Sequence, residues 1–151
     1  HGAWGVIKHL YPNADIPVIQ MSLDYNQAPQ YHYDLAQPIE SLREKGVLII
    51  GSGNMVHNLG MVSWNRLNEN FGFDWAIEAN EKMKKFILNS DHKSLINFRS
   101  QGKAFDLAIP TPEHYLPLLY SLALKDEKDN IKLFNDEAVA GALTMTSVKI
   151  G

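Results

Sequence analysis

The chain has 151 residues, enough for one domain with a buried core, and its hydrophobic fraction of 45% is ordinary for a globular protein. A net charge of −3 argues against a surface built for nucleic acid, and no apolar stretch approaches the ~18 residues of a membrane span. The absence of cysteine excludes disulfides, zinc–thiolate sites and a cysteine nucleophile, and it agrees with a cytoplasmic location.

The first third of the chain predicts a β–α–β unit. Residues 3–11 have the apolar spacing of a short helix, and residues 17–23 read as a strand. An amphipathic helix is expected over residues 31–45, with a proline inside it and Gly46 as its C-cap. The apolar run at residues 47–50 then predicts a buried strand. Two strands joined in this way would be parallel, with a right-handed crossover.

The rest of the chain alternates between helices and strands. After an irregular stretch rich in Asn and Gly, Asp74 is a plausible N-cap for a helix that ends near residue 89. The further elements expected are helices at 94–98 and 113–124 and strands at 131–134 and 143–150. The sequence therefore predicts a single α/β domain with a mainly parallel central sheet and helices on both of its faces.

Histidines stand beside glycine or proline at three places in the chain. His57 lies in the segment GSGNMVHNL directly after the predicted strand 47–50, at the sheet edge where open α/β folds bind ligands. His114 lies in PTPEHYLP, and His1 opens the chain. Imidazole is a good ligand for zinc and ferrous iron and moves protons near neutral pH. Spacing alone leaves two readings open for His57 and His114: a shared site, or separate hydrogen-bonded structural histidines.

Other motifs that carry chemistry are absent or incomplete. The segment GSG at residues 51–53 is neither a GxSxG nucleophile elbow nor a complete dinucleotide fingerprint, and Walker A and HExxH sequences are absent. Glu113 and His114 are adjacent, so their side chains cannot easily reach one atom together. The remaining histidines are expected to face solvent: His9, His32 and His92.

Five stretches together resemble one enzyme family. They are HGAW at residues 1–4, YPNADIPV at 11–18, GSGNMVHNL at 51–59, PTPEHYLPLL at 110–119 and SVKIG at 147–151. In these motifs the chain resembles the class III extradiol ring-cleaving dioxygenases, and within them the branch of the 4,5-DOPA extradiol dioxygenases. Members of that family are longer, so residues 1–151 correspond to the C-terminal part of the catalytic domain. The resemblance implies that an absent N-terminal part supplies two further metal-binding histidines.

The resemblance also implies roles for individual residues. His114 would be a ligand of the metal, and His57 would be either a further ligand or the catalytic base. His1 would stand on the substrate side of the site, and Glu113 stays a minor rival to His114 as a ligand. The implied cofactor is Fe(II), with zinc as the alternative bound metal.

The implied reaction is the insertion of O2 into a catechol such as DOPA, which opens the ring beside the diol and gives a muconic semialdehyde. The expected partners are therefore a small catechol and O2, with no nucleic acid and no membrane, and a homo-oligomer is allowed. Two alternatives stay open: a zinc-binding protein without oxygenase activity on the same scaffold, and a structural module.

Overall fold

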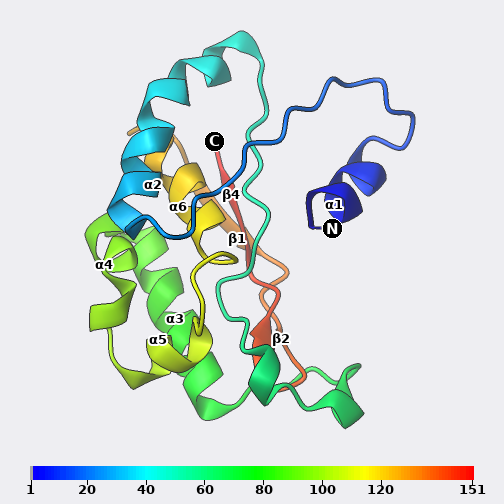
Figure 1. Ribbon diagram of the computed structural model, residues 1–151, viewed down its shortest axis with the longest axis vertical. Helices are drawn as coiled ribbons and strands as arrows, with labels where there is room; N and C mark the ends of the chain where they lie inside the picture. The colour runs from blue at the N-terminus through cyan, green and yellow to red at the C-terminus, as the bar shows by residue number, and fades with distance from the viewer. Residues whose placement is uncertain (1) are drawn as a thin grey trace.

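The computed structural model describes residues 2–151, and His1 lies outside the described residues. Helices carry most of the regular structure, and Figure 1 shows α1 lying apart from the others. The helices and 3-10 turns are, in chain order, α1 (Gly2–Leu10), α2 (Pro29–Ala36), η1 (Gln37–Lys45), η2 (Leu59–Met61), η3 (Trp64–Arg66), α3 (Asp74–Leu88), α4 (His92–Ile96), η4 (Phe98–Ser100), α5 (Lys103–Ala108) and α6 (Leu116–Ala123). Among residues 2–151, no helix is long and apolar enough to cross a membrane.

The strands are short and pair antiparallel. The strand β1 (Ile131–Phe134) pairs with β4 (Ser147–Ile150), and β2 (Ala138–Val139) pairs with β3 (Leu143–Thr144). The strand expected at residues 131–134 is thus confirmed, whereas the one expected at 143–150 is divided into β3 and β4. The sequence predicted a mainly parallel central sheet with helices on both faces. The named strands of residues 2–151 instead form two antiparallel pairs.

Two predicted strands are not strands in this structure. Residues 17–23 and 47–50 both run without regular secondary structure, and the burial expected for residues 47–50 is wrong, because Leu48 is 66% exposed. A strand requires a neighbouring strand for its backbone hydrogen bonds. Among the described residues neither segment has such a neighbour, which is why the β–α–β unit expected from the sequence does not form here.

The helix expected at residues 31–45 is divided by Pro38. The α-helix α2 ends at Ala36 and the chain continues as the 3-10 helix η1. A proline has no amide hydrogen to donate to the carbonyl four residues earlier, so the α-helical pattern fails there. Gly46 ends η1 in the left-handed region, at φ 76°, and this confirms it as the C-cap.

The main core lies between the helices and one face of the β1–β4 pair. Many of its buried side chains come from α3, α5 and α6, and half-buried residues of β1 and β4 pack against the cluster. Along β1 the side chains alternate between half-buried and exposed, as expected for a strand covered on one face only. Figure 1 shows α6 lying in front of β1 and β4. The core residues are Met83, Ile87, Phe105, Leu116, Leu119 and Leu122, among others.

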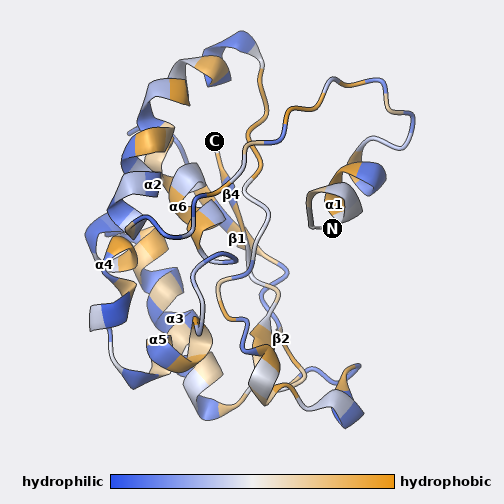
Figure 2. Ribbon diagram, viewed as in Figure 1, coloured by the Kyte–Doolittle hydropathy of each residue, from blue (hydrophilic) through white to orange (hydrophobic). Residues whose placement is uncertain are grey.

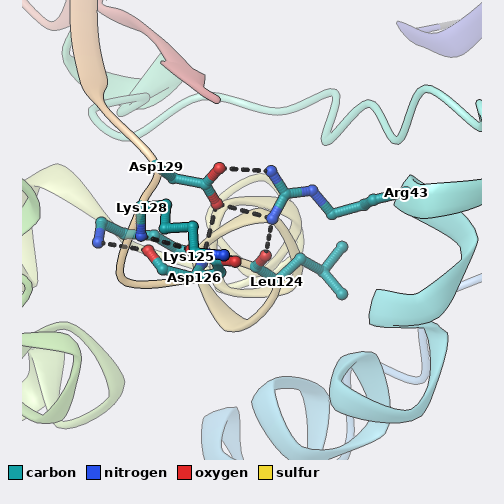
Figure 3. A network of polar contacts seen from close by, with 6 residues as sticks. All are labelled: Arg43, Leu124, Lys125, Asp126, Lys128 and Asp129. Carbon is teal, nitrogen blue, oxygen red and sulfur yellow. Dashed lines mark hydrogen bonds and ion pairs between the residues drawn. The ribbon is translucent and has the colours of Figure 1, made fainter.

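An ion pair fastens η1 to the turn that follows α6 (Figure 3). The Arg43 guanidinium donates to both carboxylate oxygens of Asp129, at 2.7 and 2.8 Å, and also to the Leu124 carbonyl oxygen. The hydrogen bond from Arg43 lowers the pKa of Asp129 to about 2. A bidentate, partly buried ion pair of this kind contributes more to stability than an ordinary surface salt bridge.

Candidate functional site

His57 is held in place by its backbone on two sides. Its amide donates to the Ala108 carbonyl at the end of α5, at 2.9 Å, and it forms an isolated antiparallel bridge with Leu143 of β3. The neighbouring Asn58 side chain donates to the Leu107 carbonyl at 2.8 Å. As a result the residue is only 6% exposed. The predicted position at a strand end is replaced by a position between a helix end and a hairpin.

The hairpin that supports His57 is itself anchored by a polar network. The Thr144 amide donates to the Val56 carbonyl at 3.2 Å, next to His57 in the chain. The buried Asn80 of α3 accepts through its side-chain oxygen from the hydroxyls of Thr144, at 3.2 Å, and Thr146, at 2.9 Å. This network connects α3 to β3 and so to the backbone that carries His57.

The imidazole of His57 has a defined tautomer. Its Nε2 lies 3.0 Å from the Thr111 carbonyl oxygen, and a carbonyl only accepts, so Nε2 carries the hydrogen. In the neutral ring Nδ1 then holds the lone pair. Within residues 2–151 this buried Nδ1 has no hydrogen-bond partner. Burial lowers the pKa of His57, and the nearby His114 lowers it further, while the backbone carbonyls of Thr111 and Asn54 and the Glu113 carboxylate act in the opposite direction.

His114 lies in the turn before α6, and its surroundings hold its backbone firmly. Its carbonyl oxygen accepts from the Asn54 amide at 2.7 Å. Its neighbour Tyr115 is buried and donates its hydroxyl to the Leu95 carbonyl at 2.8 Å. A Cβ placed on Gly53 would lie 2.1 Å from the His114 carbonyl oxygen, so only glycine allows this approach. The imidazole itself remains accessible, with 54% of the side chain exposed.

The two histidines meet although 57 positions separate them in the sequence. Their ring centroids lie 5.0 Å apart, at an interplanar angle of 60°. Glu113 stands beside them, with one carboxylate oxygen 3.4 Å from His114 Nδ1 and 2.8 Å from the Thr111 hydroxyl that donates to it. Partial burial raises the pKa of Glu113, but the Thr111 hydroxyl and the two imidazoles outweigh it, so the pKa lies below its ordinary value.

This donor set fits part of a metal centre. The buried, unpartnered Nδ1 of His57 is the kind of atom that a cation or a proton donor would satisfy, and the accessible ring of His114 lies beside the His57 ring. Across residues 2–151, however, no group of three or more His, Cys, Asp or Glu side chains is arranged to hold a metal. The described chain therefore offers two nitrogen donors. The third predicted histidine, His1, lies outside the described residues.

The expectation that three other histidines face solvent is correct only for His9. His32 is fully buried, and its Nδ1 is hydrogen-bonded to the Tyr120 hydroxyl of α6 at 3.0 Å. His92 is half-buried against the Tyr33 hydroxyl, at 2.7 Å. Both rings therefore connect α2 to neighbouring helices. Their partners lie far away in the sequence, so no local sequence pattern indicates these contacts.

Sequence comparisons agree with the motifs. The sequence profile of the catalytic LigB subunit of aromatic ring-opening dioxygenase matches residues 1–133. A 4,5-DOPA dioxygenase extradiol of Escherichia coli (strain K12) is 36% identical over 154 residues, covering 100% of this chain and 56% of its own length. The 4,5-DOPA dioxygenase extradiol of Beta vulgaris is 29% identical over 149 residues, covering 99% of this chain and 54% of its own. The chain thus spans little more than half the length of these relatives.

A solved structure shares the fold. The crystal structure of an uncharacterized protein from Escherichia coli K12 matches with a TM-score of 0.90 and 36% sequence identity. The match covers 100% of this chain and 62% of that one. The arrangement of helices and short strands described above is therefore part of a larger fold in that protein.

Proposed function

Because the chain belongs to the family of the catalytic LigB subunit of aromatic ring-opening dioxygenases, we propose that it is the C-terminal part of an extradiol dioxygenase that opens a catechol such as DOPA. The observation that carries this proposal is the convergence of His57 and His114, with ring centroids 5.0 Å apart. The motifs GSGNMVHNL and PTPEHYLP supply one ring each. The absence of cysteine further supports a cytoplasmic location.

In this proposal His114 is a metal ligand, because its imidazole is accessible and lies beside the ring of His57, whose Nδ1 has no partner among the described residues. Ferrous iron bound there would act as a Lewis acid toward a chelating diol and leave coordination positions open for it and for dioxygen. The carbonyl of Thr111 keeps the hydrogen of His57 on Nε2, so Nδ1 is the atom that acts. As a base, Nδ1 accepts a hydroxyl proton from the catechol, and as a ligand it donates its lone pair instead. His1 is assigned to the substrate side.

The proposed site requires residues beyond those described. Catalytic metal sites usually have about three protein ligands, and the described chain brings together two imidazoles. The matched relatives extend well beyond this chain, which covers 56% and 54% of their lengths. We therefore assign the missing ligands to the part of the polypeptide that corresponds to the uncovered portion of these relatives.

The deciding experiment measures oxygen uptake with catechol and L-DOPA after anaerobic loading with Fe(II). The 151-residue chain alone is expected to bind iron weakly and to cleave nothing, whereas mixing it with the N-terminal part of the Escherichia coli relative should restore ring cleavage. Strong iron-dependent cleavage by the chain alone would show that the account of an incomplete site is wrong.

Variants separate the roles of the two histidines in the mixture. His114→Ala should lose bound iron and turnover together. If His57 is the base, His57→Ala should lower turnover by roughly 10²–10⁴-fold with little loss of iron. If it is a ligand, both should fall. His9→Ala, on the exposed surface of α1, is the matched control and should change neither quantity. Normal iron content in His114→Ala would contradict its role as a ligand.

Zinc is the specific alternative, since two neutral imidazoles suit zinc as well as ferrous iron. A protein that binds zinc tightly through His57 and His114, and that consumes no oxygen with any catechol when loaded with Fe(II), would be a zinc-binding protein without oxygenase activity. Metal content by mass spectrometry and oxygen uptake, measured on the same preparation, distinguish the two functions.

A further inference from the structure

Asn80 is a buried amide on an otherwise apolar face of α3. Its exposed fraction is 5%, and the other buried residues of this helix are Ala76, Ala79, Met83 and Ile87. A buried polar side chain lowers stability unless its hydrogen bonds are made, and an apolar residue of similar size would pack at this position without that requirement. Packing alone therefore does not explain an asparagine here.

The side-chain amide of Asn80 is hydrogen-bonded at both ends. Its Nδ2 donates to Asp136 Oδ1 at 3.1 Å, and its Oδ1 accepts from the Thr144 hydroxyl at 3.2 Å. The Thr146 hydroxyl lies 2.9 Å from the same Asn80 oxygen and 2.8 Å from Asp136 Oδ1, so it can donate to either. Because a carboxylate only accepts, a single orientation of the amide satisfies these groups together. Asp136 is also paired with Lys84 of α3.

The β2–β3 hairpin that Asn80 contacts lies directly against the backbone of His57. Three successive residues of each stretch meet, in the pairs Val56–Thr144, His57–Leu143 and Asn58–Ala142. The first and third pairs are backbone hydrogen bonds of 3.2 Å, and the second is an isolated bridge. A slip of one residue in such a pairing turns each side chain to the other face. The register of the hairpin therefore decides where the His57 ring points.

The hairpin's own side chains specify this register weakly. Residues 138–143 read AVAGAL, and Figure 2 shows the ribbon at the label β2 as hydrophobic. Small apolar residues and glycine define a register less well than residues with specific partners. Ala140 lies in the left-handed region, at φ 51°, a conformation that a residue with a side chain keeps only where its surroundings enforce it. The specific contact nearest to the His57 bridge is the one between Thr144, which is 2% exposed, and Asn80.

We propose that Asn80 is a positioning residue of the candidate site. Its amide fixes the register of β3, and β3 in turn holds residues 56–58 so that the His57 ring lies beside His114. Buried polar networks in which every group is satisfied specify one arrangement of the core. Asn80 acts through the backbone and touches no reacting group. The inference rests on the proposed function only insofar as His57 is there the base or a metal ligand.

The test compares the wild-type chain with Asn80→Asp. This variant keeps the shape of the side chain and its acceptors for both threonines, but it places a second carboxylate against Asp136, and like charges at this distance repel each other. Imidazole 15N NMR is recorded above the ordinary pKa of histidine, where the ring is neutral. The wild type should show one His57 tautomer, with the hydrogen on Nε2, and Asn80→Asp should show a mixture of both.

Two further readouts follow the same variant. Amide exchange of His57 and Asn58 should become at least about tenfold faster, because their backbone loses the support of β3. In a titration with zinc chloride, Asn80→Asp should bind zinc at least about tenfold more weakly than the wild type, the order of effect that follows the loss of groups that orient metal-ligating side chains.

Exchanging the two groups provides a rescue. In the double variant Asn80→Asp with Asp136→Asn, the carboxylate and the amide change places, and the hydrogen bonds to each other and to both threonines can form again. All three readouts should return to within about twofold of Asp136→Asn alone, which differs from the wild type in its lost pair with Lys84. A double variant that behaves like Asn80→Asp would overturn the proposal.

Arg43→Gln is the control for a loss of stability alone. It removes the bidentate pair with Asp129, whose partners lie in η1 and in the turn after α6. Its free energy of unfolding should fall, while the His57 tautomer, the amide exchange of His57 and the zinc affinity should stay as in the wild type, at a temperature where circular dichroism shows each protein folded. If Asn80 contributed stability only, Asn80→Asp would resemble this control, and the proposal would be wrong.

The remaining outcomes are also decisive. If Asn80→Asp does not fold, Thr144→Val removes the same hydrogen bond while keeping the side-chain shape, and a folded Thr144→Val with a single His57 tautomer and unchanged exchange would overturn the proposal. A wild-type chain with mixed tautomers would overturn it as well. The NMR and exchange readouts require neither metal nor turnover. A disturbed His57 ring in Asn80→Asp, together with no oxygen uptake by the wild-type mixture, would support this inference and contradict the proposed catalytic function.

Discussion

A methyl group added at residue 53 should separate the two halves of the candidate site. In Gly53→Ala the new Cβ would lie 2.1 Å from the His114 carbonyl oxygen and 3.2 Å from Pro117 Cγ. The oxygen belongs to the backbone, so relief requires the segments to move apart by about 1 Å, and overpacking of this kind costs about 1–3 kcal/mol. The bond from the Asn54 amide to that oxygen, now 2.7 Å, would be weakened, which adds about 0.5–1.5 kcal/mol. We expect a total loss of about 1.5–4.5 kcal/mol in the free energy of unfolding.

Urea denaturation followed by circular dichroism measures this loss, and a zinc titration measures its effect on the histidine pair. Gly60→Ala is the matched control, since a Cβ there meets its nearest atom, Asn58 Oδ1, at an ordinary 3.4 Å. The control should stay within about 0.5 kcal/mol of wild type, and Gly53→Ala should bind zinc more weakly than the control. A Gly53→Ala protein with the stability and zinc affinity of wild type would refute the steric reasoning.

Three further predictions concern buried polar groups. Tyr115→Phe should lower the free energy of unfolding by about 1–2 kcal/mol, because the buried Leu95 carbonyl loses its donor, and an unchanged urea midpoint would contradict this. The pKa of Asp129 falls to about 2 through its bond with Arg43, so the pair contributes stability above the unfolded value of 3.8 that is lost as pH falls toward 2. Between pH 4 and 2 the wild type should therefore lose about 1–2 kcal/mol of its free energy of unfolding through this pair, and Asp129→Asn should remove that loss. Burial lowers the pKa of His32 below 6.5, so the unfolded chain takes up the proton first and stability falls as pH drops below that value. His32→Gln should reduce this slope in urea titrations between about pH 6.5 and 5, and an unchanged slope would argue against burial of a neutral ring.

The sequence predicted those features whose causes lie within a few neighbouring residues. The helix α3 and the left-handed end at Gly46 follow from local apolar spacing and from the conformational freedom of glycine, although Asp74 is the first residue of the helix and Phe73, not Asp74, is its N-cap. The proline inside the helix expected at residues 31–45 is Pro38, and the α-helical pattern ends just before it. The strand at residues 131–134 has the alternation of a sheet covered on one face.

Features that depend on distant partners were not predictable from local pattern. The run at residues 47–50 has the composition of a buried strand, but burial requires a covering layer that the described residues do not supply. His32 lies in a polar stretch, and only the approach of Tyr120 from α6 explains its burial. Of the site, the sequence motifs indicated His57 and His114, whereas the carbonyl of Thr111 that fixes the tautomer has no sequence signature, because every residue has a carbonyl.

The hydrogen bonds around the site join the same two stretches of chain, and in each of them the stretch at residues 54–57 donates to a carbonyl of residues 108–114. The Asn54 amide holds the carbonyl of His114, while the backbone and ring of His57 hold the carbonyls of Ala108 and Thr111. Because these bonds join the two stretches to each other, the stretches should separate together, as one cooperative unit of local unfolding. The affinity of the histidines for any cation then includes the free energy of that opening. A substitution that weakens any of these hydrogen bonds should therefore lower the metal affinity and speed the hydrogen exchange of the Asn54 and His57 amides, with the two effects in proportion.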